Sequence, residues 1–182
     1  MKLKPFYLLI IISLITCCVR SSKLVRDNSI DEKIMVNKLY IPDSLDLYIE
    51  GRPNLLSKVN LFNKKTLIYH LNGDCDACIN SLNEWNELIH KNFTVYNLNI
   101  LVIAHVSELD LFKMFLKEVN IKYPIYIDPY DEFFFKNMLT QSQRYEMFLV
   151  DCDKTILAMG NLLYDNKSMS IFLDVLNNKT IN

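Results

Sequence analysis

The stretch Leu67-Ile68-Tyr69-His70-Leu71-Asn72-Gly73-Asp74-Cys75-Asp76-Ala77-Cys78 decides the fold. Its first five residues form an apolar run of strand length, and the Asn-Gly-Asp that follows is a turn signal. Beyond the C-x-x-C motif, apolar residues recur at helical spacing to about residue 91: Ile79, Leu82, Trp85, Leu88 and Ile89. A helix N-terminus has unpaired N–H groups and partial positive charge, which stabilise a thiolate. Because the thiolate is the attacking species in disulfide exchange, this placement predicts a redox pair.

The composition of the 182 residues suits one globular domain with short extensions. The 20 Lys and Arg residues nearly balance the 21 Asp and Glu residues. No field of one sign is therefore available to bind nucleic acid, and we expect no nucleic-acid partner. Hydrophobic residues make up 51% of the chain, which is enough for a well-filled core.

The N-terminus has the pattern of a bacterial secretory signal. Residues 1–4 contain two lysines and form a basic segment. An almost unbroken apolar run, too short to span a bilayer comfortably, covers residues 6–15. The sequence Leu14-Ile15-Thr16-Cys17 resembles a lipobox, the bacterial lipoprotein cleavage site at which the cysteine is lipidated. Its threonine departs from the usual Gly, Ala or Ser, and Cys18 is the less favoured acceptor.

We therefore expect a lipoprotein signal peptide over residues 1–16 and a flexible tether over residues 17–40. An uncleaved N-terminal anchor is the alternative. In both cases the domain is exported and held at a membrane, so the predicted location is the bacterial cell envelope, on the periplasmic side, where disulfides are permitted. The domain then contains Cys75, Cys78 and Cys152, an odd number that leaves at least one thiol over.

Strand and helix signals alternate along the rest of the chain and then give way to a hairpin. The expected strands are 45–49, 67–71, 100–104, 123–128, 145–151 and 154–159, and the expected helices are 75–91, 107–119, 132–139 and 168–176. This order predicts an α/β domain with a mixed sheet.

The same order, with C-x-x-C on the first crossover, resembles the thioredoxin-like superfamily. Within it the chain is similar to the membrane-tethered, exported thiol–disulfide oxidoreductases of bacteria, the TlpA-like and redoxin branch. Three stretches carry the resemblance: Tyr69–Cys78, Met147–Asp151 and Lys154–Asn161. The resemblance implies a thioredoxin-like domain over residues 41–182, with a central mixed sheet flanked by helices. It also implies exchange of disulfides with exported proteins, a redox partner that resets the pair, and no cofactor.

Two positions depart from the family pattern. Members usually have a tryptophan just before the first cysteine, where this chain has Asp74. They also have a cis-proline before the strand that matches Met147–Asp151, where this chain has Tyr145. A non-proline cis bond costs about 2.5–4 kcal/mol, so we expect a trans peptide at Tyr145 and a substrate loop of different shape.

By position, Cys75 is the expected nucleophile and Cys78, one turn inside the helix, is the expected resolving thiol. The flanking carboxylates of Asp74 and Asp76 should raise the pKa of Cys75, since like charges disfavour a thiolate. A nearby carboxylate costs on the order of 1 kcal/mol, against roughly 0.3–1 kcal/mol from the helix dipole. We therefore expect a less oxidising pair that works as a reductant or exchanger.

Other functions stay open at this point. The main alternative is a non-catalytic thioredoxin-fold binding or assembly lipoprotein with a structural disulfide, which the residues at 74 and 145 favour. A zinc site would need four ligands, and no second C-x-x-C or H-x-x-x-H completes one. A thiol peroxidase would have Pro and then Thr or Ser ahead of the cysteine, where this chain has Ile68 and Asn72.

Three other features have expected structural roles. We expect Cys152 to be a poorly activated thiol in a turn and His70 to be a half-buried packing residue. The cluster Phe133-Phe134-Phe135 is expected to pack in the core or at an interface.

Overall fold

The computed structural model describes residues 38–49, 52–53, 61–119, 121–140 and 147–177. Its strands are β1 (Asp46–Ile49), β2 (Arg52–Pro53), β3 (Thr66–Asn72), β4 (Asn99–His105), β5 (Ile125–Asp128), β6 (Met147–Val150) and β7 (Ile156–Gly160). Its helices are α2 (Asp76–Asn92), α3 (Leu109–Leu116), α4 (Glu132–Lys136) and α5 (Asn166–Leu176).

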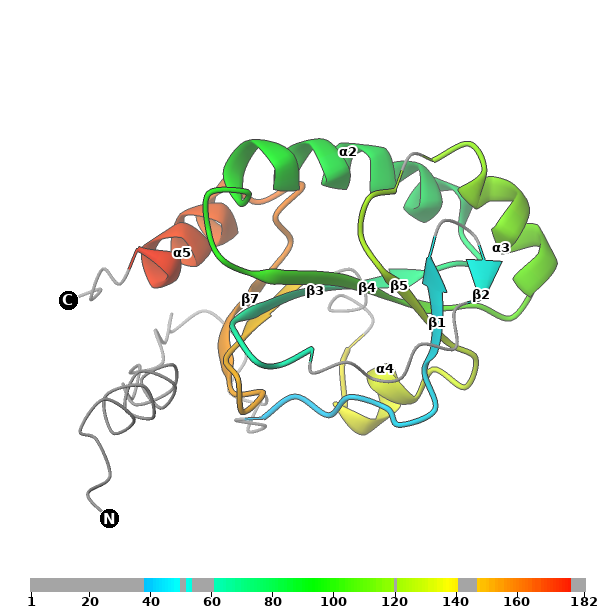
Figure 1. The fold of residues 1–182 in the computed structure, drawn as a ribbon, viewed down its shortest axis with the longest axis horizontal. Helices are drawn as coiled ribbons and strands as arrows, with labels where there is room; N and C mark the ends of the chain where they lie inside the picture. The colour runs from blue at the N-terminus through cyan, green and yellow to red at the C-terminus, as the bar shows by residue number, and fades with distance from the viewer. Residues whose placement is uncertain (1–37, 50–51, 54–60, 120, 141–146, 178–182) are drawn as a thin grey trace, which may run out of the picture.

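The strands form one mixed sheet in the order β2-β1-β5-β4-β3-β6-β7. The central strands β3, β4 and β5 are parallel, and the outer strands pair antiparallel to their neighbours. Figure 1 shows α2 and α5 on one face of this sheet and α4 on the other. The expected α/β architecture, a central mixed sheet flanked by helices, is confirmed.

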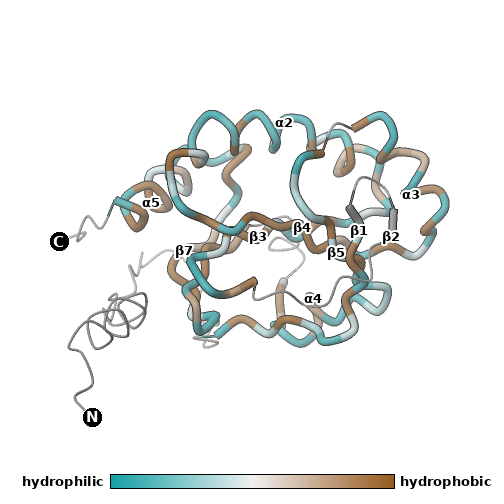
Figure 2. Tube along the Cα trace, in the orientation of Figure 1, coloured by the Kyte–Doolittle hydropathy of each residue, from teal (hydrophilic) through white to brown (hydrophobic). Residues whose placement is uncertain are grey.

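Strand β3 is buried on both faces, which explains its continuous apolar sequence. Alternate side chains point to opposite faces of a strand. Leu67, Tyr69 and Leu71 accordingly belong to the core under α2, α3 and α5, whereas Ile68 packs in the second core with Phe133 of α4. Figure 2 shows the central strands as hydrophobic and much of α2 as hydrophilic, as expected for a helix with one buried face.

The predicted order of elements is confirmed, and differences lie at the ends. Helix α2 begins at Asp76 because Cys75 has extended backbone angles and is the N-cap. Strand β1 is the expected N-terminal strand, but the short β2 lies outside it at the sheet edge. In α4, Phe133 and Phe134 are buried as expected, whereas Phe135 is 65% exposed.

The packed domain extends at least to Lys38, before the expected start at residue 41. Leu39 is 2% exposed in the core on the α4 side, and its N–H donates to Lys154 O at 2.8 Å. The Asn137 amide also contacts this segment, accepting from Tyr40 N at 2.7 Å and donating to Tyr40 O at 2.9 Å.

The expected signal peptide, including Cys17, most of the expected tether, and Tyr145 lie outside the described residues. Within the described part of the chain, no helix is long and apolar enough to cross a membrane.

Replacing Leu39 by Ala tests whether this segment belongs to the folded unit. Because the leucine is buried, Leu39→Ala should lower the free energy of unfolding by about 2–5 kcal/mol, measured by urea denaturation. Val95→Ala is a suitable control, since Val95 is 83% exposed and its truncation should change stability by less than about 0.5 kcal/mol. Equal stability of Leu39→Ala and the wild type would contradict the packing.

Candidate redox site

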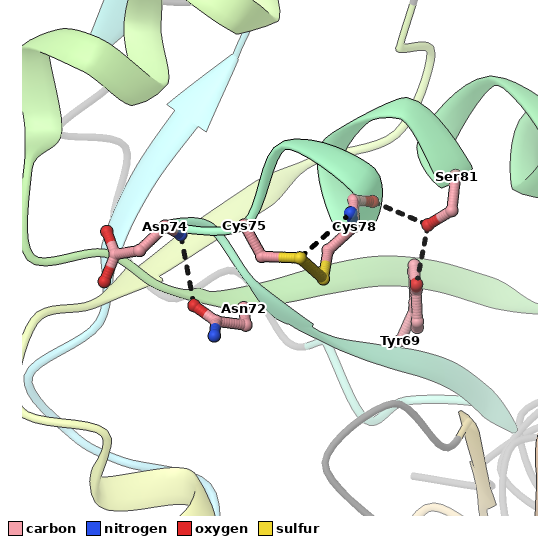
Figure 3. Close-up of a disulfide and its surroundings, with 6 residues drawn as sticks. All are labelled: Tyr69, Asn72, Asp74, Cys75, Cys78 and Ser81. Atoms are coloured by element: carbon pink, nitrogen blue, oxygen red, sulfur yellow. Dashed lines mark hydrogen bonds between the residues drawn. A yellow bond between two sulfur atoms is a disulfide. The ribbon is translucent and has the colours of Figure 1, made fainter.

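The two cysteines of the motif lie at the start of α2, directly after the central strand β3. Cys75 and Cys78 form a disulfide with their Cα atoms 5.2 Å apart, and both residues are half-buried. Cys75 caps the helix: its carbonyl accepts from Cys78 N at 2.9 Å and Ile79 N at 3.0 Å. Its Sγ also accepts from Cys78 N at 3.3 Å (Figure 3). The same N–H would stabilise a negative charge on the Cys75 sulfur once the disulfide opens.

The turn of α2 that contains Cys78 is anchored to β3 by a chain of hydroxyl groups (Figure 3). Ser81 Oγ donates to Cys78 O at 2.6 Å. Since this bond uses the hydroxyl proton of Ser81, the Tyr69 hydroxyl, 3.1 Å away, must be the donor in the second bond. Tyr69 in turn stacks on Trp85, with ring centroids 5.5 Å apart. The position of the second cysteine is thus set by the buried core.

Gly73 allows the loop before Cys75 to lie against the end of β4. Its N–H donates to His105 O at 2.7 Å. A Cβ at this position would lie 2.6 Å from Val106 Cγ2 and 2.9 Å from His105 O, too close for any other residue without a shift of the backbone. The close approach therefore requires a glycine.

The Asp74 carboxylate points away from Cys75 (Figure 3) and bonds to the start of α3. Oδ1 accepts from Ser107 N at 2.9 Å and from Glu108 N at 3.4 Å, and Oδ2 accepts from Ser107 Oγ at 2.7 Å. The N-cap residue of α3, Glu108, makes no side-chain capping bond of its own. Asp74 thus caps α3 from a different element.

The ionisation of Asp74 follows from these contacts. Partial burial raises the pKa of the Asp74 carboxyl, but the hydrogen bonds from Ser107 and Glu108, with a smaller contribution from His105, hold it below its ordinary value. The sequence predicts that Asp74 lies beside the nucleophile, but it does not predict the hydrogen bonds to Ser107 and Glu108. The partners are 33 and 34 residues away in the chain, and no local pattern connects them to Asp74.

His105, at the end of β4, was not among the predicted site residues. Its Nδ1 lies 3.1 Å from Asp128 O and its Nε2 lies 3.9 Å from Asp74 Oδ2. Among the residues that the structure describes, no group of His, Cys, Asp and Glu side chains could hold a metal ion.

The other predicted site residues either lie apart from the contacts of Asp74 and His105 or fall outside the described residues. Asp76 is exposed in the first turn of α2. Cys152 is half-buried in the turn between β6 and β7, where its N–H donates to the Asp151 carboxylate at 2.7 Å. Tyr145 and Cys17 are not within the described residues, so their roles stay predictions.

The prediction of a half-buried His70 is wrong, because its side chain is fully buried. It packs 5.0 Å from the Phe133 ring, between centroids, and its Nε2 lies 3.6 Å from Asp131 Oδ1. Both contacts are on the α4 side of the sheet, whereas Cys78 packs on the α2 side. The sequence around residue 70 does not indicate full burial, because the carboxylate that His70 faces belongs to Asp131, far along the chain on the loop before α4.

Comparison with known proteins identifies the fold. No protein-family model matches the chain, and no curated protein matches it at a significant level. Solved structures do match. A thiol-disulfide isomerase from Corynebacterium glutamicum is 20% identical with a TM-score of 0.57, over 80% of this chain and 99% of that one. A putative protein disulfide isomerase from Bacteroides thetaiotaomicron is 16% identical with a TM-score of 0.55, over 80% and 92% of the two chains. The exposed lipoprotein thioredoxin of Streptococcus pneumoniae is 16% identical with a TM-score of 0.51, over 74% and 97%.

This chain has the thioredoxin-like fold. The resemblance inferred from the C-x-x-C motif and the order of elements is therefore confirmed at the level of the fold. In this fold the disulfide occupies the start of the first crossover helix, α2.

Asp74→Ala tests the cap on α3 through its dependence on pH. Because the folded-state pKa of Asp74 is lowered, the ionised carboxylate stabilises the protein above the unfolded-state value of about 4, and this contribution is lost as the pH falls through the folded-state value. The variant should be less stable than the wild type by about 1 kcal/mol at pH 7, and the difference should shrink below pH 4.

Urea unfolding from pH 2 to pH 7 measures this difference. Asp110→Ala is the control, because that side chain is in the first turn of α3 but is 98% exposed. A difference between Asp74→Ala and the wild type that stays constant with pH would contradict the role of the charge.

Tyr69→Phe tests the hydroxyl chain to Cys78. The substitution removes one buried donor and leaves the ring that stacks on Trp85, so it should lower the free energy of unfolding by about 1 kcal/mol. Tyr164→Phe is the matched control, since Tyr164 is 74% exposed and its hydroxyl should contribute little. Identical thermal midpoints for Tyr69→Phe and the wild type would argue against the anchor.

Proposed function

We propose that the protein is a thiol–disulfide oxidoreductase in which Cys75 is the nucleophile and Cys78 the resolving thiol. The observation that carries this proposal is the position of the Cys75 sulfur, at the N-cap of α2, where it accepts the Cys78 N–H. The fold shared with solved thiol–disulfide isomerases supports the same reaction class. A structural disulfide needs only the correct separation, whereas a nucleophile also needs stabilisation of its anion.

In the reductive direction, the Cys75 thiolate attacks one sulfur of a substrate disulfide. The substrate S–S bond breaks, its other sulfur leaves as a thiolate, and a mixed disulfide joins Cys75 to the substrate. Cys78 then loses its proton and attacks Cys75 Sγ, which releases the second substrate thiolate and forms the Cys75–Cys78 disulfide seen here. Two electrons pass from the dithiol to the substrate, and the reaction uses only the two thiols.

The charges near the pair favour reduction or exchange over strong oxidation. Asp76 is exposed in the first turn of α2, next in sequence to the nucleophile, and its carboxylate disfavours the thiolate. A less stabilised thiolate makes a disulfide less oxidising, since the reduced form is then less favoured.

The proposed setting is the bacterial cell envelope. The signal-like N-terminus and Cys17, as lipid acceptor, would hold the domain on the periplasmic side of a membrane. Exported proteins with thiols or disulfides would be its substrates, and a separate redox partner would reset the pair. The likeness to an exposed lipoprotein thioredoxin supports this setting.

A second candidate is a binding or assembly lipoprotein in which the disulfide only locks the start of α2. The observation that favours it is the fixed position of Asp74, the residue before Cys75, because its carboxylate accepts three hydrogen bonds from Ser107 and Glu108 just before α3. The reduction potential of the pair distinguishes the two functions.

We expect a reduction potential near −270 mV, at the reducing end of the range of about −120 to −270 mV covered by working couples, measured by equilibration with glutathione or dithiothreitol. A value below about −300 mV would support the structural disulfide instead. In the same protein, Cys78→Ser should accumulate mixed disulfides with a model substrate, because the resolving thiol is missing. Cys75→Ser should form none above background, and Cys152→Ser should behave as the wild type.

A further inference from the structure

We propose that an apolar surface around α4 docks on the lipid membrane to which the N-terminus tethers the domain. This surface, called the α4 surface below, is formed by the side chains of Tyr40, Tyr130, Phe135 and Met138. The inference rests on the membrane setting of the proposed function, but it does not depend on the redox reaction of the two cysteines.

The α4 surface contains much of the exposed apolar side-chain area of the described residues. Of the eight large hydrophobic side chains that are exposed there, four belong to this surface. Tyr130, Phe135 and Met138 are 72%, 65% and 74% exposed, and Tyr40 is 37% exposed. Single exposed apolar residues are common on protein surfaces, whereas several in one region indicate an interaction site.

Met138 occupies a position at which glycine is the favoured residue. Helix α4 ends in a Schellman motif, in which Met138 N–H donates to Phe135 O and Leu139 N–H donates to Phe134 O, both at 3.1 Å. The residue after the C-cap has a left-handed backbone in this motif, and Met138 has a φ of 51°. Glycine adopts this conformation without strain. Because the methionine side chain is also largely exposed, it adds little to the core, and its presence points to a contact outside the domain.

The chain enters the domain along the same helix. Tyr40 N–H donates to Asn137 Oδ1 at 2.7 Å, and the Tyr40 hydroxyl donates to Glu132 Oε2 at 3.2 Å. Since Glu132 is in the first turn of α4 and Asn137 is its C-cap, the entering segment lies along the whole helix. The α4 surface is therefore next to the point at which the chain joins the domain.

The length of the expected tether keeps this point close to the membrane. Cys17, the proposed lipid acceptor, is 21 positions before Lys38. A flexible chain of that length has a root-mean-square span of about 25 Å. This span is short compared with the surface of a whole domain, so the side at which the chain enters is the side that meets the lipid.

A small apolar surface is sufficient for such docking. Once the N-terminus is in the membrane, docking is intramolecular and occurs at a high effective concentration. The tyrosines have the amphipathic rings that suit a membrane interface, and the exposed Lys136 could extend its ammonium group to lipid phosphates. A second copy of the chain is a poorer fit, because a stable protein interface uses roughly 20–30 residues on each side.

Docking by α4 would leave the disulfide accessible to substrates. Figure 1 shows α4 and α2 on opposite faces of the sheet. Phe133 and Phe134 of α4 pack in one core, and Cys78 packs against the other. The membrane contact would thus orient the redox site without covering it.

Photo-labelling from the lipid tests the docking on the full-length protein. The chain would be reconstituted in vesicles of phosphatidylethanolamine and phosphatidylglycerol that contain a phospholipid with a diazirine in its acyl chains. After irradiation, lipid adducts would be mapped by mass spectrometry. We expect adducts in residues 6–15 and in the peptide that contains Phe135 and Met138. We expect none at Val95 or Tyr164, although these side chains are 83% and 74% exposed.

Met138→Gly is the test variant because it removes the apolar side chain at a position that favours glycine. Its urea midpoint should equal or exceed that of the wild type. Loss of one apolar side chain from the lipid should lower the adducts at α4 about tenfold relative to the adducts at residues 6–15. Val95→Ala is the matched control and should leave this ratio unchanged.

The adducts at residues 6–15 separate docking from anchoring. Wild-type protein labelled at residues 6–15 but not at α4 would overturn the docking and leave the anchor intact, and an undiminished α4 signal in Met138→Gly would also overturn it. A chain without any adducts would contradict the membrane setting and the docking together. The redox function is decided by the reduction potential of the cysteines, so it can fail or succeed independently of this result.

Discussion

The burial of β3 on both faces is the constraint on which the rest of the structure depends. A strand in this position has no solvent-exposed side, so its register and direction are fixed by packing above and below. Its C-terminal end then delivers the turn and the first cysteine to the start of α2. Tyr69 of β3 also fixes the start of α2. Its hydroxyl group is hydrogen-bonded to Ser81, and the Ser81 hydroxyl donates to the carbonyl of Cys78.

Much of this arrangement could be predicted from local sequence. The apolar run of β3, the helical spacing of Ile79, Leu82 and Trp85, and the turn between them are short-range patterns. They also place the cysteines at a helix N-terminus, where the structure has them. The burial of Leu39 was missed because the apolar stretch Leu39-Tyr40-Ile41 is too short to give a periodic signal.

The electrostatics of the site could not be predicted in the same way. Asp74 and Asp76 look equivalent in the sequence, since each is adjacent to Cys75. They differ in their tertiary contacts. Asp74 contacts the start of α3 and the end of β4, whereas Asp76 is exposed to solvent. Similarly, His70 and His105 lie on neighbouring strands near the same end of the sheet. His105 contacts the loop before the nucleophile, whereas His70 packs against Phe133 of α4. Contacts between residues more than 30 positions apart decide these roles.

The packing of Leu39 has a mechanical consequence. The chain enters the described domain at Lys38, whose bridge to Thr155 and the neighbouring bond from Leu39 to Lys154 join it to the β6–β7 turn. The side-chain amide of Asn137, at the end of α4, forms hydrogen bonds with the backbone N–H and carbonyl of Tyr40. A pulling force applied through the N-terminus would be borne by these contacts on the α4 side of the sheet, whereas the disulfide lies at the start of α2 on the other side. Tension at the N-terminus would thus act first on the contacts of residues 38–40 and would reach the cysteines only through the sheet.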